Sequence, residues 1–170
     1  INSIYFHDLA FSGHANSRHG INWLSMSRSY IGNCRFDSLA GAAIYTTSSL
    51  VVTVNNCVMS GCGYGIYGTG SGWTGMNGWN IHNCYISSSI NQGIYIVNGL
   101  TGSNFSGNTF ESNKLGGVYL GQDVEAVAFE GCYFEENKTA STVTYDISLG
   151  ATSYVASVGI RNCYFNSDSD

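Results

Sequence analysis

A six-residue pattern recurs seven times along the chain, and its spacing restricts the fold more than any other feature. Its clearest copy reads Ile-Gly-Asn-Cys-Arg-Phe, and the seven copies occupy residues 6–11, 31–36, 54–59, 81–86, 105–110, 129–134 and 160–165. Equivalent positions in successive copies are 23 to 31 residues apart. A repeat in this range is typical of a solenoid, in which each repeat forms one coil and contacts only its neighbours.

Neither end of the chain reads as the polar cap that closes a solenoid. The sequence starts at Ile1 in the middle of the pattern and stops at Asp170 soon after the seventh copy. We therefore expect residues 1–170 to form one repetitive domain that is an excerpt of a longer chain.

Each copy of the hexapeptide predicts two short strands that meet at a corner. Positions 1, 4 and 6 are apolar or small, whereas positions 2, 3 and 5 are mostly polar. A single strand alternates with a period of two, so the step of three between positions 1 and 4 implies a bend at position 3. Asn and Gly tolerate the left-handed backbone of a tight corner. They occupy position 3 at Asn33, Asn56, Asn83, Gly107, Gly131 and Asn162. The sixth positions form an inward column of Phe11, Phe36, Met59, Ile86, Phe110, Phe134 and Phe165.

A second signature, about ten residues further on, predicts a third strand in each coil. It combines a small residue, a β-branched residue and, in most copies, a tyrosine. The β-branched side chain is expected to face inward and the next one outward, as alternation along a strand requires. The copies lie at 20–22, 43–45, 65–67, 93–95 and 117–119, with a weaker one at 146–148.

These features together predict an all-β fold, a single-stranded right-handed parallel β-helix of about seven coils with three short strands per coil. Parallel crossovers are right-handed in nearly all proteins, and stacked coils place equivalent residues about 4.8 Å apart. A helical repeat is excluded because β-branched, aromatic, Asn and Gly residues dominate and no helix caps recur.

Charge and hydropathy argue against binding to nucleic acid and against a membrane-spanning helix. The net charge is −5 and only 10% of residues are charged. This argues against nucleic acid, which calls for a basic surface. No apolar run approaches the ~18 residues of a membrane-spanning helix.

The cysteines are expected to be buried thiols and not a metal site or disulfides. Five share one inward column: Cys34, Cys57, Cys84, Cys132 and Cys163. Their spacing lacks any Cys-x-x-Cys pair, and parallel stacking of their Cβ vectors is the wrong geometry for a disulfide. Cys62 lies out of register and is expected to be a free surface thiol. Thiols without evident pairs indicate assembly in a reducing compartment such as a bacterial cytoplasm.

Two glutamates are the first candidate catalytic pair. The segments 111–114 and 135–138 both read Glu-x-Asn-Lys and occupy adjacent coils. Glu111 and Glu135 should therefore lie one rung apart, about 5 Å between backbones, which is close to the carboxyl separations of glycosidases. The competing interpretation is a solvated edge at which Lys114 and Lys138 neutralise the glutamates. The substitute carboxylates are Glu136, Asp123 and Asp146.

Repeated tyrosines are the candidate substrate-binding residues. Tyr45, Tyr67, Tyr95 and Tyr119 should form an outward column on the third strands. Such rings can stack on sugars, stabilise the sheet through same-face pairs or form a subunit interface. A second, partial column is Tyr85, Tyr133 and Tyr164.

The histidines near the start of the chain do not form a recognisable metal motif. His7, His14 and His19 are separated by seven and five residues, a spacing that matches no metal signature. We interpret them as solvated loop residues and predict neither a metal nor another cofactor.

The repeated hexapeptide followed by Gly-Ile-Tyr resembles the pectate-lyase-like superfamily of right-handed β-helices over essentially the whole chain. The resemblance implies the fold and leaves the chemistry open, because the repeated residues are core and corner positions. The acidic metal cluster of calcium-dependent pectate lyases, the Asp-Pro-His motif of alginate epimerases and the paired aspartates of pectin hydrolases are absent. Plant-polysaccharide activities are therefore disfavoured.

Degenerate repeats, low charge and outward aromatic residues also resemble the β-helices of bacteriophage tailspikes. That resemblance implies a homotrimer, outside the cell or on the virion surface, that binds and hydrolyses a bacterial capsule, O-antigen or similar polysaccharide. One alternative is a secreted polysaccharide lyase or hydrolase of another branch, which calls for Lys114, Lys138 or Arg161 near the carboxylates. The other is an adhesive or structural solenoid without enzymatic activity.

Overall fold

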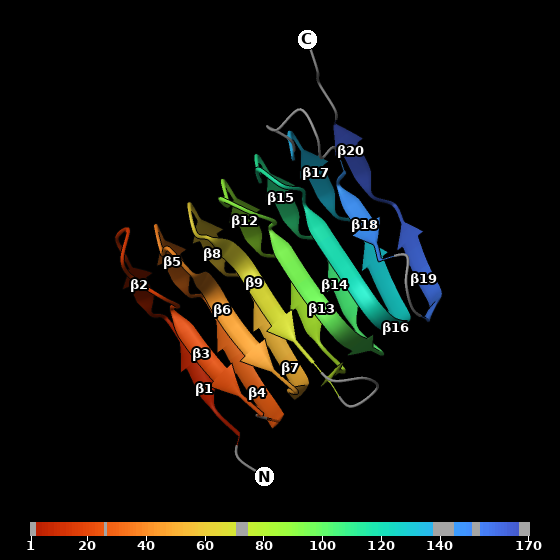
Figure 1. Cartoon of the computed structure of the whole chain (residues 1–170), viewed down its shortest axis with the longest axis horizontal. Coiled ribbons are helices and arrows are strands. Elements are labelled where there is room, and N and C mark those ends of the chain that lie inside the picture. Colours follow the sequence, from red (N-terminus) through yellow and green to blue (C-terminus); the bar gives the residue numbers. More distant parts are fainter. Residues whose placement is uncertain (1–2, 26, 71–74, 138–144, 151–153, 167–170) are drawn as a thin grey trace.

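A computed structural model describes residues 3–25, 27–70, 75–137, 145–150 and 154–166, and these form a solenoid of short strands (Figure 1). The coils stack in chain order, from the red N-terminal coil to the blue C-terminal coil. Every strand pairing among the described residues is parallel. The described part of the chain contains no helix. The predicted all-β parallel solenoid is confirmed.

The strands form three faces, as the repeat predicts. The first face holds the strands at the start of the hexapeptides: β1 (Tyr5–His7), β4 (Ser27–Gly32), β7 (Leu50–Asn55), β11 (Asn80–His82), β14 (Asn104–Ser106), the end of β16 (Val118–Glu130) and β19 (Val155–Arg161). The second face holds those at their ends: β2 (Ala10–Ser12), β5 (Arg35–Asp37), β8 (Val58–Ser60), β12 (Tyr85–Ser87), β15 (Thr109–Glu111), β17 (Tyr133–Glu135) and β20 (Tyr164–Asn166). The third face holds β3 (Ile21–Leu24), β6 (Ala42–Thr47), β9 (Tyr64–Thr69), β13 (Ile94–Thr101), the start of β16 and β18 (Ile147–Leu149).

Two sheets result from these three faces. β16 continues from the third face into the first, and the short β10 (Met76–Asn77) pairs with both β7 and β13. The first and third faces are thereby joined in one 13-stranded sheet. The second face is a separate sheet of seven strands, one from each hexapeptide.

The inward column of sixth positions stacks in register along the second face. Phe110 and Phe134 are fully buried, and their ring centroids are 4.8 Å apart. Phe11 stacks on Phe36 at 4.7 Å in the same way. Burial of such a side chain stabilises the fold by about 1.5–3 kcal/mol, and the ring contact adds about 0.5–1.5 kcal/mol. The core is therefore a set of ladders that run along the solenoid.

The predicted corner at position 3 is confirmed. All seven residues at this position have a left-handed backbone with φ between 52° and 60°: Asp8, Asn33, Asn56, Asn83, Gly107, Gly131 and Asn162. A second left-handed corner follows two residues after each of five sixth positions, at Ser38, Gly61, Ser88, Ser112 and Glu136. At each of these corners, the next residue turns inward.

The expectation that Cys62 is a surface thiol is wrong. Cys62 is fully buried and its Sγ lies 3.8 Å from the carbonyl oxygen of Phe36. The cause is the second corner, because left-handed Gly61 turns the following residue into the core. Cys62 belongs to an inward column with Leu39, Ser89, Asn113 and Asn137.

Four of the five cysteines of the predicted inward column are buried, whereas Cys163, in the last described coil, is only partly buried. Cys34, Cys57, Cys84 and Cys132 are at most 2% exposed, and all six cysteines of the chain are free thiols. Each of the four donates to a carbonyl, as Cys34 does to Gly32 at 3.2 Å. Burial raises the pKa of Cys132 to about 11. The Cys132 thiol is therefore a protonated core group near neutral pH.

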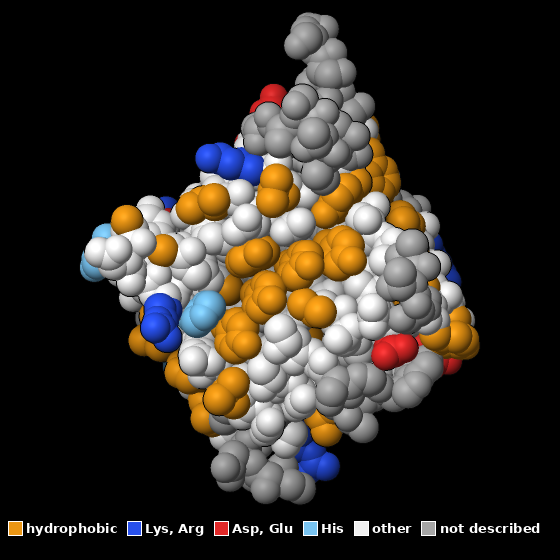
Figure 2. All heavy atoms as spheres, viewed as in Figure 1, with side chains coloured by type: hydrophobic (Ala, Val, Ile, Leu, Met, Phe, Trp, Pro, Cys, Tyr) orange, Lys and Arg blue, Asp and Glu red, His pale blue; other side chains and the backbone are white. Residues whose placement is uncertain are grey.

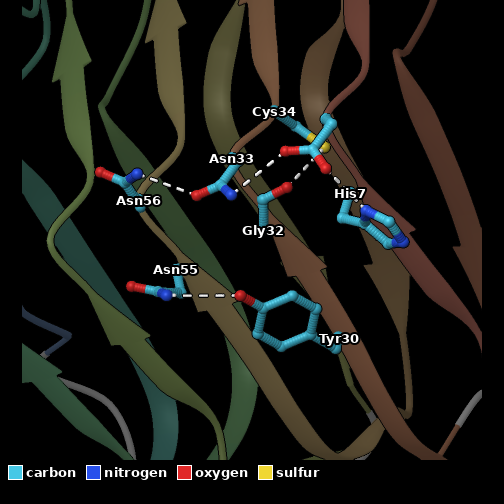
Figure 3. Close-up of polar contacts among 8 residues, drawn as sticks. His7, Tyr30, Gly32, Asn33, Cys34, Asn55 and Asn56 are labelled. Carbon is cyan, nitrogen blue, oxygen red and sulfur yellow. Dashed lines mark hydrogen bonds and ion pairs between the residues drawn. The ribbon is translucent and has the colours of Figure 1, made fainter.

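Polar ladders accompany the corners on the outside of the solenoid (Figure 3). The Asn56 amide donates to the Asn33 side-chain oxygen at 2.8 Å, and the Asn33 amide donates to Asp8 at 3.1 Å. Hydrogen bonds from His7 and Asn33 lower the pKa of Asp8. On the adjoining strands, the Asn55 amide donates to the Tyr30 hydroxyl at 3.3 Å. The corner residues thus link successive coils through their side chains.

A second polar ladder lies inside the solenoid. The amide of Asn113 donates to Asn137 at 2.8 Å and to the carbonyl of Ile86 at 3.1 Å, while its oxygen accepts the backbone N–H of Ser89. Buried amides in this arrangement satisfy backbone groups that would otherwise lack partners. Asn108, which replaces a cysteine of the hexapeptide, does the same for Cys84 and Ile81.

Candidate functional site

The predicted carboxylates and the predicted tyrosine column lie on different faces. Glu111 and Glu135 lie on β15 and β17 of the seven-stranded sheet, whereas the tyrosine column lies on β6, β9, β13 and β16 of the 13-stranded sheet. The structure therefore does not combine them in one site.

Glu111 and Glu135 are adjacent in register, as the repeat predicts. Both alternate with the inward phenylalanines and point outward, half-buried. The Tyr85 hydroxyl donates to the Glu111 carboxylate at 2.6 Å, and the Asn166 amide donates to Glu135 at 3.0 Å. These contacts hold the carboxylates in place from the coils before and after them.

The second, partial tyrosine column shares this face with the glutamates. Tyrosine occupies the position before the inward residue on three strands, and the glutamates occupy the position after it, so both project to the same side. Tyr133 stacks on Tyr164 with centroids 5.4 Å apart and planes 5° apart. Tyr85 is 38% exposed and Tyr164 is 59% exposed. We name the outer side of β12, β15, β17 and β20 the Glu–Tyr face; it comprises Tyr85, Glu111, Tyr133, Glu135, Tyr164 and Asn166.

The electrostatics of the Glu–Tyr face show how closely its groups interact. The hydrogen bond to Glu111, followed by burial, raises the pKa of Tyr85. An ionised phenol would lose that hydrogen bond and face a carboxylate. Tyr85 therefore stays a protonated donor near neutral pH, and it orients Glu111.

The substitute carboxylates are distributed over two corners. Glu136 is exposed at the corner after β17 with a φ of 49°, and its carboxylate lies 3.4 Å from the Ser112 hydroxyl. Asp146 precedes β18 and accepts from the buried Asn137 amide at 3.0 Å. Asp123 has a φ of 53° within β16, at the corner between the third and first faces. Of these, Glu136 directly follows the Glu–Tyr face, whereas Asp123 lies at a different corner of the coil.

The long tyrosine column is a continuous stack of rings. Successive centroids of Tyr45, Tyr67, Tyr95 and Tyr119 are 4.8 to 5.5 Å apart, with planes within 16° of parallel. Figure 2 shows the hydrophobic side chains as a diagonal band over β6, β9, β13 and β16. Because neighbouring rings cover each other's faces, the stack presents ring edges and hydroxyls to solvent. Binding of a sugar by these tyrosines remains a prediction, and a bound sugar would contact the ring edges and hydroxyls and not the ring faces.

A scan against protein-family models shows the family of the chain. Residues 19–169 match the model described as the right-handed β-helix region. The chain belongs to this family. Comparison of the β-helix with curated proteins and with solved structures found no match. The family assignment agrees with the predicted handedness and with the resemblance to β-helical proteins, and it specifies no activity.

His19 extends the tyrosine stack of the β-helix, which the sequence did not suggest. Its ring lies 4.7 Å from that of Tyr45, and its Nδ1 accepts the backbone N–H of Ala42 at 3.0 Å. Burial, followed by the charge of Arg18, lowers its pKa. His7 and His14, in contrast, are exposed. Within the described ranges, no three His, Cys, Asp or Glu side chains are grouped so as to hold a metal ion.

Not all of the basic residues expected for a lyase lie on the same sheet of the β-helix as Glu111 and Glu135. Arg161 lies on β19 of the other sheet, in register with Glu130. Lys114 comes after the corner residue Ser112, and Lys138 lies outside the described residues.

Across the described residues, no helix is long and apolar enough to cross a membrane.

Proposed function

We propose that this β-helix binds a bacterial surface polysaccharide on its Glu–Tyr face and hydrolyses it with Glu111 and Glu135. The observation that carries the proposal is the combination, on one sheet, of two carboxylates in register with outward tyrosines. Aromatic side chains pack against the apolar faces of sugars, while paired carboxylates provide an acid and a base for glycosidic cleavage.

The long shape of the face supports a polymeric ligand. Tyr85, Tyr133 and Tyr164 come from β12, β17 and β20 of the same sheet, so they follow the solenoid axis. A chain of sugars laid along the axis would meet tyrosines on either side of the Glu111–Glu135 rung. We propose hydrolysis and not a lyase reaction because the rung carries two carboxylates in register. Arg161, one of the three basic residues considered for a lyase, lies on the other sheet.

The proposal includes the biological setting implied by the tailspike resemblance. In that setting the β-helix is part of a homotrimeric receptor-binding protein that acts outside the cell or on a virion surface. The exposed edges of the tyrosine stack supply a surface for contact between subunits. Light scattering coupled to gel filtration of the protein tests this part, and a monomer would contradict it.

The decisive experiment is incubation of the protein with purified capsule or lipopolysaccharide, followed by detection of released oligosaccharides. A Glu111→Gln, Glu135→Gln double variant should bind the polymer and release at least about a hundredfold less product, the size of a typical acid–base contribution. Glu130→Gln, on the first face, is the matched control and should retain activity. Undiminished cleavage by the double variant would refute the catalytic assignment, and binding without any cleavage by the parent would reduce the function to adhesion.

A further inference from the structure

The charges of the Glu–Tyr face all have one sign. Its strands β12, β15, β17 and β20 read Tyr-Ile-Ser, Thr-Phe-Glu, Tyr-Phe-Glu and Tyr-Phe-Asn, so these strands contribute two carboxylates and no lysine or arginine. Further along the sheet, Arg35 is paired with Asp37 on its own strand at 2.6 Å. The strands around the candidate site therefore offer a ligand negative charge and aromatic rings.

Negative charge beside exposed phenols matches one class of sugar substituent. An ammonium group is attracted by a carboxylate, and also by an aromatic ring at a distance of about 6 Å or less. A uronate or another acidic sugar would meet like charge, which weakens binding. Tyr85, hydrogen-bonded to Glu111, and Tyr133, on the same strand as Glu135, each stand beside one of the carboxylates.

We propose that the Glu–Tyr face selects a polysaccharide that carries free amino groups, such as a de-N-acetylated amino-sugar polymer. This inference rests on the proposed function, because it names the class of polymer bound at the same site. The ammonium groups contact Glu111 and Glu135, and the sugar rings pack against the tyrosines. Replacement of the amine by an acetamide removes the charge and with it the electrostatic part of the affinity.

The test compares the binding of three oligosaccharides of equal length to the unsubstituted protein by calorimetry: a polyglucosamine oligomer, its fully N-acetylated counterpart and an oligogalacturonate. A slightly acidic buffer of low ionic strength keeps the amines charged. We expect the polyglucosamine oligomer to bind at least about tenfold more tightly than the acetylated one, a difference of about 1.4 kcal/mol. The difference should shrink as salt is added, because the contacts are exposed and therefore screened.

Variants separate the charge contacts from the aromatic ones. Glu111→Gln with Glu135→Gln should abolish the preference, because it removes the charges that attract the ammonium groups, while Glu130→Gln on the first face should preserve the preference. Circular dichroism of each variant confirms that it is folded.

Failure of this inference differs from failure of the proposed function. Equal affinity for the two glucosamine oligomers, a preference for the oligogalacturonate, or no binding of any of the three would overturn the amine selectivity. If the parent nevertheless binds or cleaves capsule or lipopolysaccharide, the proposed function stands. Absence of binding to those polymers as well would refute both.

Discussion

Replacement of Val51 by glycine is expected to stabilise the protein. Val51 is a β-branched residue with a left-handed φ of 53°, a conformation that disfavours branched side chains. Its side chain is 55% exposed, so truncation removes little buried surface. The register places it beside Gly78, which forms the same corner in the next coil with a φ of 67°.

The magnitude follows from two opposing effects. A left-handed backbone costs a residue with a Cβ about 1–2 kcal/mol. Glycine avoids this cost but loses about 0.5–1 kcal/mol through the greater freedom of its unfolded chain. The Val51→Gly variant should therefore gain about 0.5–1 kcal/mol in the free energy of unfolding. The reciprocal Gly78→Val variant should lose a similar amount, because a Cβ at Gly78 would meet its nearest atoms at an ordinary 3.6 Å.

Urea unfolding at constant temperature measures both changes. The fluorescence of the buried Trp23 and Trp79 reports the transition. Val52→Gly is the control for loss of a buried side chain, since Val52 is fully buried next to Val51, and it should be strongly destabilising. A Val51→Gly variant that is less stable than the parent, or a Gly78→Val variant of unchanged stability, would refute the reasoning from backbone conformation.

Three further predictions concern the polar and titratable groups. Asn113→Ala removes the partners of buried backbone groups and should lower the free energy of unfolding in urea by about 2–4 kcal/mol. Asn80→Ala, at an exposed position, is the control and should change it little. Equal effects of the two variants would contradict the role of the polar ladder inside the solenoid. In the native protein a thiol reagent should label the partly exposed Cys163 faster than the buried Cys132, whose pKa burial raises to about 11. Equally rapid labelling of both would exclude the buried column. Burial lowers the pKa of His19 below its ordinary 6.5. The contribution of the neutral His19 to the free energy of unfolding is therefore fully present above pH 6.5 and is lost as the pH falls through the pKa of the folded state. A His19→Gln variant whose stability shows the same pH profile would contradict this.

The repeat allowed most of the core to be predicted because a solenoid converts sequence period into spatial register. Phe110 and Phe134 occupy the same position of successive repeats, so they had to stack once the coils were parallel. The same reasoning predicted that Glu111 would lie opposite Glu135 and that Tyr95 would lie beside Tyr119.

The burial of Cys62 was not predicted, although the sequence contained a signal for it. Cys62 stands three residues after the inward Met59, with a glycine between them, and the same step of three places Cys57 in the core after Val54. The pattern does not predict the second corner because serine or glutamate replaces glycine in most coils. A left-handed serine, such as Ser112, has no reliable sequence signature.

The sequence by itself determined the ladders, because a constant order of inward, outward and corner residues admits one register between parallel coils. Only the tertiary structure decided which ladders share a face and which side chains reach across coils. It separated Glu111 from the long tyrosine column, joined it to Tyr85 through a hydrogen bond, and placed His19 at the end of the ring stack. The reason is physical: alternation along a strand decides which side chains point inward, but the left-handed corners decide where one face ends and the next begins, as at Ser112 after β15. Asn and Gly mark the first corner in the sequence, whereas the second corner falls on residues such as Ser112 and Glu136, whose type does not indicate a left-handed backbone.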